Sequence, residues 1–133
     1  MRHKKHLKEL DIADQEHVSI QNHYPAFSFR YLQEASINEC SKVKFFYTFL
    51  MRLRTLSCTE WKEIDKSSRH SFGYEKIPIS LIHVALPSVI TPEVKTLTVF
   101  RATGDNHAFI GFRDLDVFSI IFIESQFGDI YNH

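Results

Sequence analysis

Residues 97–123 read LTVFRATGDNHAFIGFRDLDVFSIIFI and hold three apolar runs. Two polar sequences separate these runs, Gly104-Asp105-Asn106 and Asp114-Leu115-Asp116. Short apolar runs between clusters of Gly, Asn and Asp are typical of antiparallel strands joined by tight turns. The last run, Val117–Ile123, is almost wholly apolar, as in strands that are buried on both faces. We therefore expect strands at 97–103, 107–113 and 117–123, with the last one inside a sheet.

The residues before this region predict one strand and two helices. Phe27–Leu32 alternates aromatic with polar residues, which indicates a half-buried strand. Apolar residues then recur at spacings of three and four from Ser41, a residue type that favours N-caps, to about Leu56, and this pattern predicts a helix. Ser57, followed three residues later by Glu60, matches a capping box and predicts a second short helix that ends near residue 68.

Between these helices and residue 97, the sequence predicts a loop and a strand. Residues 69–76 show no apolar period, so we expect a loop there. Ile79–Leu86 is apolar and is followed by Pro87, which predicts a strand. The expected architecture is a single α+β domain: an N-terminal strand, an α-hairpin, then an antiparallel β meander with the helices packed on one sheet face. Residues 1–24 are polar and are expected to form a loosely packed extension.

Composition excludes several classes of protein. The chain of 133 residues is 44% hydrophobic and 24% charged, as in ordinary globular proteins. Its two cysteines, Cys40 and Cys58, form neither a disulfide framework nor a zinc motif, and no apolar run approaches the length of a membrane span. We therefore expect a cytoplasmic protein without membrane association. Four N-terminal histidines lack ligand spacing, so we expect no metal and no cofactor.

The net charge of zero is the sum of a basic N-terminal segment and an acidic C-terminal segment. Residues 1–104 carry fifteen Lys/Arg against eleven Asp/Glu, and residues 105–133 carry one against five. The basic excess is greatest in the helical region, which either forms a solvated surface or contacts phosphates. The candidate RNA-binding residues are Lys42, Lys44, Arg52, Arg54, Lys62, Lys66, Arg69 and Arg113. The twelve Phe residues lie mostly in periodic apolar segments, so they are better explained as core than as base-stacking groups.

The order of elements and the C-terminal sequence resemble those of the RelE/ParE superfamily of toxin–antitoxin ribonucleases. Phe100–Ile110 looks like the superfamily's block of basic residue, glycine, turn and strand, and Val117–Ile123 is similar to its core strand. Tyr131 and His133 resemble the C-terminus of the YoeB branch. The chain departs from the pattern at His107, where the family usually has Arg, and at Gln126-Phe127, where it often has a basic pair.

This resemblance implies a metal-free endoribonuclease that cuts messenger RNA on the ribosome and is neutralised by an antitoxin protein. Such cleavage needs a base for the 2′-hydroxyl, a cation for the phosphate and an acid for the leaving oxygen. The candidates are Glu75 or His70 as the base, Arg101, Arg69 and Arg113 as phosphate ligands, and His107, Tyr131 or His133 as the acid.

Each candidate also has an ordinary structural interpretation. Residues 69–76 suit a polar loop, Tyr131 suits a packed ring, and Arg101 with His107 suits a cross-strand pair on one sheet face. The alternative function is therefore a non-catalytic module of the same fold that binds a protein or a nucleic acid.

Overall fold

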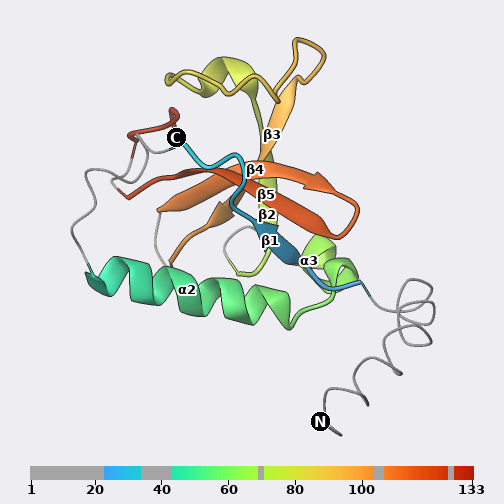
Figure 1. Cartoon of the computed structure of the whole chain (residues 1–133). Helices are drawn as coiled ribbons and strands as arrows, with labels where there is room; N and C mark the ends of the chain where they lie inside the picture. Colours follow the sequence, from blue (N-terminus) through green and yellow to red (C-terminus); the bar gives the residue numbers. More distant parts are fainter. Residues whose placement is uncertain (1–22, 34–42, 69–70, 104–106, 126–127) are drawn as a thin grey trace, which may run out of the picture.

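The computed structural model describes residues 23–33, 43–68, 71–103, 107–125 and 128–133. It confirms the α+β class, with two helices and a sheet of five strands, four of them antiparallel (Figure 1). The elements are β1 (Ala26–Ser28), α2 (Val43–Ser57), α3 (Trp61–Lys66), β2 (Tyr74–Pro78), the 3-10 helix η2 (Ile79–Leu81), β3 (Thr96–Arg101), β4 (Ala108–Asp114) and β5 (Val117–Ile123).

The strands lie in the order β1-β5-β4-β3-β2. From β2 to β5 the chain forms the predicted meander, in which each strand pairs antiparallel with the next. The short strand β1 pairs with β5 in parallel, with Phe27 opposite Phe118. Strand β5 therefore has a neighbour on each side, and all of its residues after Val117 are buried. This confirms the prediction that 117–123 is an interior strand.

A β-bulge sits in the middle of the β4–β5 pair. Ile110 is opposite Phe122 and Gly111 is opposite Ile120, so Ile121 is the extra residue on β5. The bulge lets Ile121 and Phe122 join the same core cluster although they are consecutive. A Cβ atom added to Gly111 would collide with the carbonyl oxygen of Ser119. The close approach of the two strands here therefore requires glycine.

Both helices cover one face of the sheet. Phe45, Phe49, Leu53 and Leu56 of α2, with Trp61 and Ile64 of α3, are buried against apolar residues of β3, β4 and β5. The centre of this cluster is aromatic: Phe100 stacks on Phe109 with ring centroids 5.2 Å apart, and both meet Phe118 edge-on. Such edge-on and offset pairs stabilise a core beyond the area that they bury. The predicted packing of the helices on one face is confirmed.

The opposite face is covered by irregular chain. Residues 79–95 lie over this face on the side away from α2, and the C-terminal residues lie beside them (Figure 1). The two segments are tied by backbone hydrogen bonds, from His83 N to Ile130 O at 3.0 Å and from Asn132 N to Leu81 O at 3.1 Å. Ile130 and Tyr131 are buried in the second core cluster. The last residues of the chain are thereby held against the sheet.

Two predictions about the segment after the helices were wrong. Residues 74–76 belong to strand β2 rather than to a loop, because Tyr74–Pro78 pairs fully with β3. Ile79–Leu86 is not a strand: it begins with η2, and within it Ile82 makes an isolated bridge to Tyr131. Its side chains are apolar because they cover a sheet face. A covering segment and a buried strand can have the same run of apolar residues, so the sequence alone does not distinguish them.

Two predicted boundaries also differ. The N-terminal strand ends at Ser28 rather than near Leu32, because Leu32 N bonds back to Phe29 O in a turn. Ser57 does not cap the second helix. Its hydroxyl donates to Arg54 O within α2, and Glu60 is the N-cap residue of α3 without a side-chain capping bond. The predicted cap at Ser41 and the turn at 104–106 lie outside the described residues.

We predict that Gly111→Ala lowers the free energy of unfolding by about 2 kcal/mol or more, because the β4–β5 pair must separate to admit the methyl group. Gly128→Ala is the comparison. It has open space around it and a φ of +87°, so its loss is limited to backbone strain of about 1–2 kcal/mol. Urea unfolding of the two variants measures both. A Gly111 variant as stable as the original chain would contradict the close approach.

Candidate functional site

Two predicted catalytic residues share the sheet face opposite the helices. Arg101 is opposite Ala108, and Glu75 is opposite Val99. Ala108 and Val99 both belong to the core cluster on the face away from α2. Directly opposed residues of an antiparallel pair project from the same side of a sheet. Arg101 and Glu75 therefore lie on that side, on neighbouring strands and diagonally adjacent.

His107 lies on the other side. Its ring packs edge-on against Phe45 of α2, with centroids 5.4 Å apart, and its carbonyl accepts a hydrogen bond from Ala102 N. The predicted sharing of one face by Arg101 and His107 is therefore wrong. The residue opposite Arg101 is Ala108, whereas the prediction from the turn sequence placed His107 there. Successive residues of a strand project from opposite faces, so this shift of one residue puts His107 on the other face.

A buried glutamate–histidine contact that the sequence did not suggest lies at the end of β5. Glu124 is completely buried, and His133 Nε2 lies 2.6 Å from its Oε1. Ile130 N donates to the other carboxylate oxygen at 3.2 Å. A carboxylate bound to one ring nitrogen fixes the tautomer and the orientation of an imidazole. Glu124 thus holds His133 in a defined position, with 20% of the histidine side chain exposed.

Tyr131 completes this cluster as a packing group. It is 4% exposed, and its ring lies against that of His133 with centroids 4.0 Å apart. The expectation that Tyr131 packs its ring is met, and its burial leaves little room for direct contact with a large substrate. His133 is therefore the better candidate for an acid among the two C-terminal residues.

Arg101, Ala108 and Glu124 form one row across three strands. Glu124 N donates to Ala108 O at 2.7 Å. Glu124 and Ala108 therefore extend the β4–β5 register by one residue beyond the pair of Phe109 and Ile123. Two strand spacings separate the backbones of Arg101 and Glu124, which is about 10 Å. Ala108 lies between them and is buried in the second core cluster. Arg101 and the Glu124–His133 pair therefore lie on either side of this buried residue.

A second guanidinium group, that of Arg52 on helix α2, lies near Arg101. Arg52 of α2 donates to Ser71 O and lies over the ring of Phe72, while its Nε is buried with no hydrogen-bond partner. Burial lowers the pKa of Arg52, and the charge of Arg101 lowers it further. The two guanidinium groups therefore lie near enough to each other for their charges to interact.

The other predicted RNA-binding residues are less concentrated. Arg113 is engaged within the protein: it lies 4.0 Å from the centroid of Trp61, pairs with Asp65 at 3.6 Å and donates to Leu115 O. Lys62 pairs with Glu60 at 3.4 Å. Lys44, Arg54 and Lys66 are exposed on the two helices. Lys42, Arg69 and His70 lie outside the described residues.

The contacts of Arg113 belong to a polar network that joins α3 to the sheet. Tyr74 donates to Asp65 at 2.7 Å, and this bond together with burial raises the pKa of Tyr74. His23, at the start of the described chain, pairs with Asp116 at 2.9 Å. Trp61 Nε1 donates to Asp116 O. Because every charged group here has a partner on another element, we interpret this network as structural.

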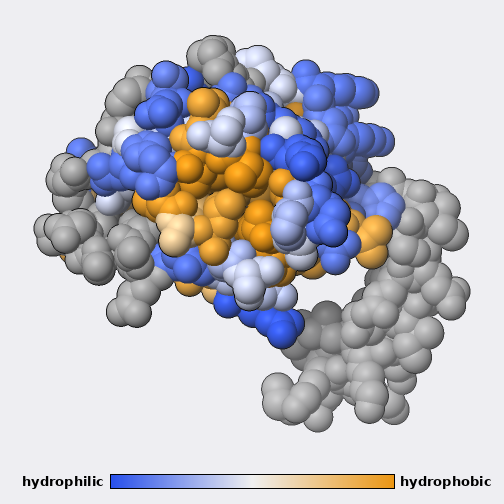
Figure 2. Space-filling model, turned by 90° about the horizontal axis from the view of Figure 1, so that it is seen from above, coloured by the Kyte–Doolittle hydropathy of each residue, from blue (hydrophilic) through white to orange (hydrophobic). Residues whose placement is uncertain are grey.

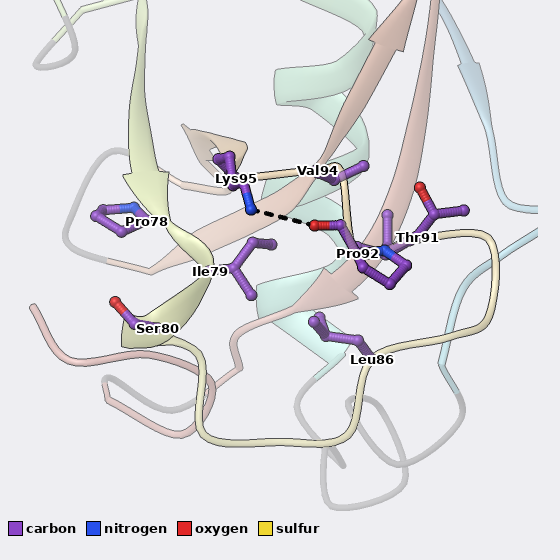
Figure 3. A pocket seen from close by; sticks show the side chains of 9 residues that line it. Pro78, Ile79, Ser80, Leu86, Thr91, Pro92, Val94 and Lys95 are labelled. Carbon is purple, nitrogen blue, oxygen red and sulfur yellow. Dashed lines mark hydrogen bonds between the residues drawn. The ribbon is translucent and has the colours of Figure 1, made fainter.

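An apolar hollow of about 450 Å³ lies beside η2, between Ile79, Leu86 and Val94 (Figure 3). Viewed from above, this side of the molecule shows an apolar area with hydrophilic residues around it (Figure 2). The one charged group that lines the hollow, Lys95, donates to Pro92 O at 3.4 Å (Figure 3). The lining holds no acid–base pair, so the hollow is not a candidate for proton-transfer chemistry.

Among the residues that the structure describes, no cluster of three or more His, Cys, Asp or Glu side chains has the arrangement of a metal site. In the same part of the chain, no helix combines the length and apolar character needed to cross a bilayer. Comparison of the chain with protein-family models, curated proteins and solved structures finds no match.

We predict that His133→Ala lowers the free energy of unfolding by about 2 kcal/mol, because it leaves the buried Glu124 side chain without the hydrogen-bond partner of its Oε1 atom. Adding Glu124→Gln should restore part of this loss, since a neutral amide is easier to bury and its oxygen still accepts from Ile130 N. Urea unfolding of the single and double variants measures the difference. A double variant less stable than His133→Ala alone would show that the carboxylate is not the destabilising group.

Proposed function

We propose that this protein is a RelE/ParE-like toxin that cleaves messenger RNA without a metal, in the cytoplasm, and is neutralised by an antitoxin. One observation carries the proposal: Arg101 and the Glu124–His133 pair lie on either side of Ala108 in a single row on the sheet face opposite the helices. The order of strand, two helices and meander supports it as well, because the resemblance implies that order.

The arrangement suits the chemistry of RNA cleavage. Glu75 removes the proton from the 2′-hydroxyl, and the 2′-oxygen forms a bond to phosphorus. Arg101 stabilises the negative charge that builds on the phosphate oxygens, since its planar group donates two hydrogen bonds at once. The bond from phosphorus to the 5′-oxygen breaks, and His133 gives that oxygen a proton. The products are a 2′,3′-cyclic phosphate and a 5′-hydroxyl.

Each group has support in the geometry. Glu75 and Arg101 are diagonal neighbours on the same side of the sheet, and Arg52 adds positive charge at that end. Glu124 orients His133, so it is a positioning residue rather than a catalytic one. The acidic turn at Asp114–Asp116 lies at the opposite end of β4 and β5, where it does not repel RNA from this site.

We predict that Arg101→Ala reduces RNA cleavage about 100-fold or more, because a phosphate in the transition state loses its main cation. The assay mixes purified chain, ribosomes and messenger RNA, and it maps the ends of the fragments. Growth arrest on expression should disappear in the same variant. Lys76→Ala is the matched control: Lys76 is exposed on β2, next to Glu75, and should leave cleavage unchanged.

The chemistry of the fragment ends separates this proposal from metal-dependent hydrolysis. We expect a cyclic phosphate on the upstream fragment and a hydroxyl on the downstream one. Fragments with a 5′-phosphate would contradict the proposed step, and so would cleavage that Arg101→Ala leaves intact.

A further inference from the structure

Helix α2 exposes an apolar stripe. Its buried residues face the sheet, but Val43, Tyr47 and Leu50 are 82%, 64% and 59% exposed. Spacings of four and three residues place these side chains along one side of the helix, and Arg54 continues the same line four residues later. We call this row of Val43, Tyr47, Leu50 and Arg54 the α2 stripe. It lies on the helical side of the molecule, away from the sheet face that carries Arg101.

An aligned row of this kind differs from ordinary surface apolar residues. Single exposed leucines are common, whereas large apolar groups in register along a helix are typical of helix pairing. Folding gains little from these positions because most of their area remains in water. The stripe is therefore better explained by an interaction than by the stability of the isolated fold.

The charges around the stripe indicate what it binds. Helix α2 contains Lys44, Arg52 and Arg54 and no acidic residue. Lys44 and Arg54 are exposed next to the apolar side chains. A partner helix with apolar residues at the same spacing and Asp or Glu beside them would satisfy both features.

Two other occupants fit less well. A second copy that packed its α2 antiparallel to the first would bring Lys44 close to Arg54 of the other chain, and α2 has no acid to offset that repulsion. RNA would gain phosphate contacts from the basic residues and one stacking ring from Tyr47, but the aliphatic side chains of Val43 and Leu50 offer no ring on which further bases could stack.

We propose that the α2 stripe docks an amphipathic helix of a partner protein, with acidic residues of that helix paired to Lys44 and Arg54. This surface lies outside the site proposed for RNA cleavage, so the inference stands independently of that activity.

The test uses the full chain and a synthetic, fluorescein-labelled helical peptide with leucines at helical spacing and glutamates on both flanks. A matched peptide carries lysine in place of each glutamate. Fluorescence anisotropy measures both dissociation constants. We expect the acidic peptide to bind at least about tenfold more tightly than the basic one, and Leu50→Ala with Tyr47→Ala to weaken it about tenfold. Arg54→Glu should reduce the difference between the two dissociation constants or make the basic peptide bind more tightly than the acidic one.

The control variant is Phe29→Ala, which removes a side chain of similar exposure from a surface outside α2. It should leave peptide binding unchanged. Equal affinity for the two peptides, or acidic-peptide binding that survives the α2 substitutions, would overturn the proposal. So would sedimentation that shows a dimer of the chain alone which Leu50→Ala dissociates, since a second copy would then occupy the stripe. Loss of binding to a labelled RNA oligonucleotide in the Leu50→Ala variant would assign the stripe to RNA instead.

Discussion

The burial of β5 on both faces is the constraint on which the rest of the structure depends. A strand that reads VFSIIFI exposes apolar side chains on each side of the sheet, so both sides need a cover. The amphipathic helices α2 and α3 cover one side through a cluster of aromatic rings. The other side has no α-helix among the described residues, and the chain covers it with residues 79–95, which begin with the 3-10 helix η2, and with the C-terminal tail.

This second cover also creates the candidate site. The tail is held by its bonds to Leu81 and His83, and that attachment brings His133 to the buried Glu124. The site therefore depends on packing rather than on a motif. His133 acquires a defined position because Ile130 and Tyr131, just before it in the tail, are buried in the second core cluster. Arg101 lies at the same end of the sheet as Glu124, while the acidic turn is at the far end.

The sequence predicted the elements with strong local signals. Turn residues and apolar runs located β3, β4 and β5, and helical spacing located α2. Prediction failed where a segment's role depends on distant partners: β2 is a strand because β3 pairs with it, and Ile79–Leu86 is apolar because it covers the sheet. Three of the four residues of the site could be anticipated. Arg101, Glu75 and His133 were named from their chemistry, but Glu124 was overlooked because an acid at the end of an apolar strand looks like a solvent-exposed terminus.

The most direct test of the account is where RNA binds. A crystal structure of the chain with a short RNA that carries a 2′-deoxy nucleotide at the cleaved position would keep the substrate intact, because the attacking hydroxyl is missing. The account predicts that the uncleaved phosphate lies on the sheet face opposite the helices, bound by Arg101 and within reach of His133. A phosphate bound instead along α2, with Arg101 and His133 remote from it, would contradict the account.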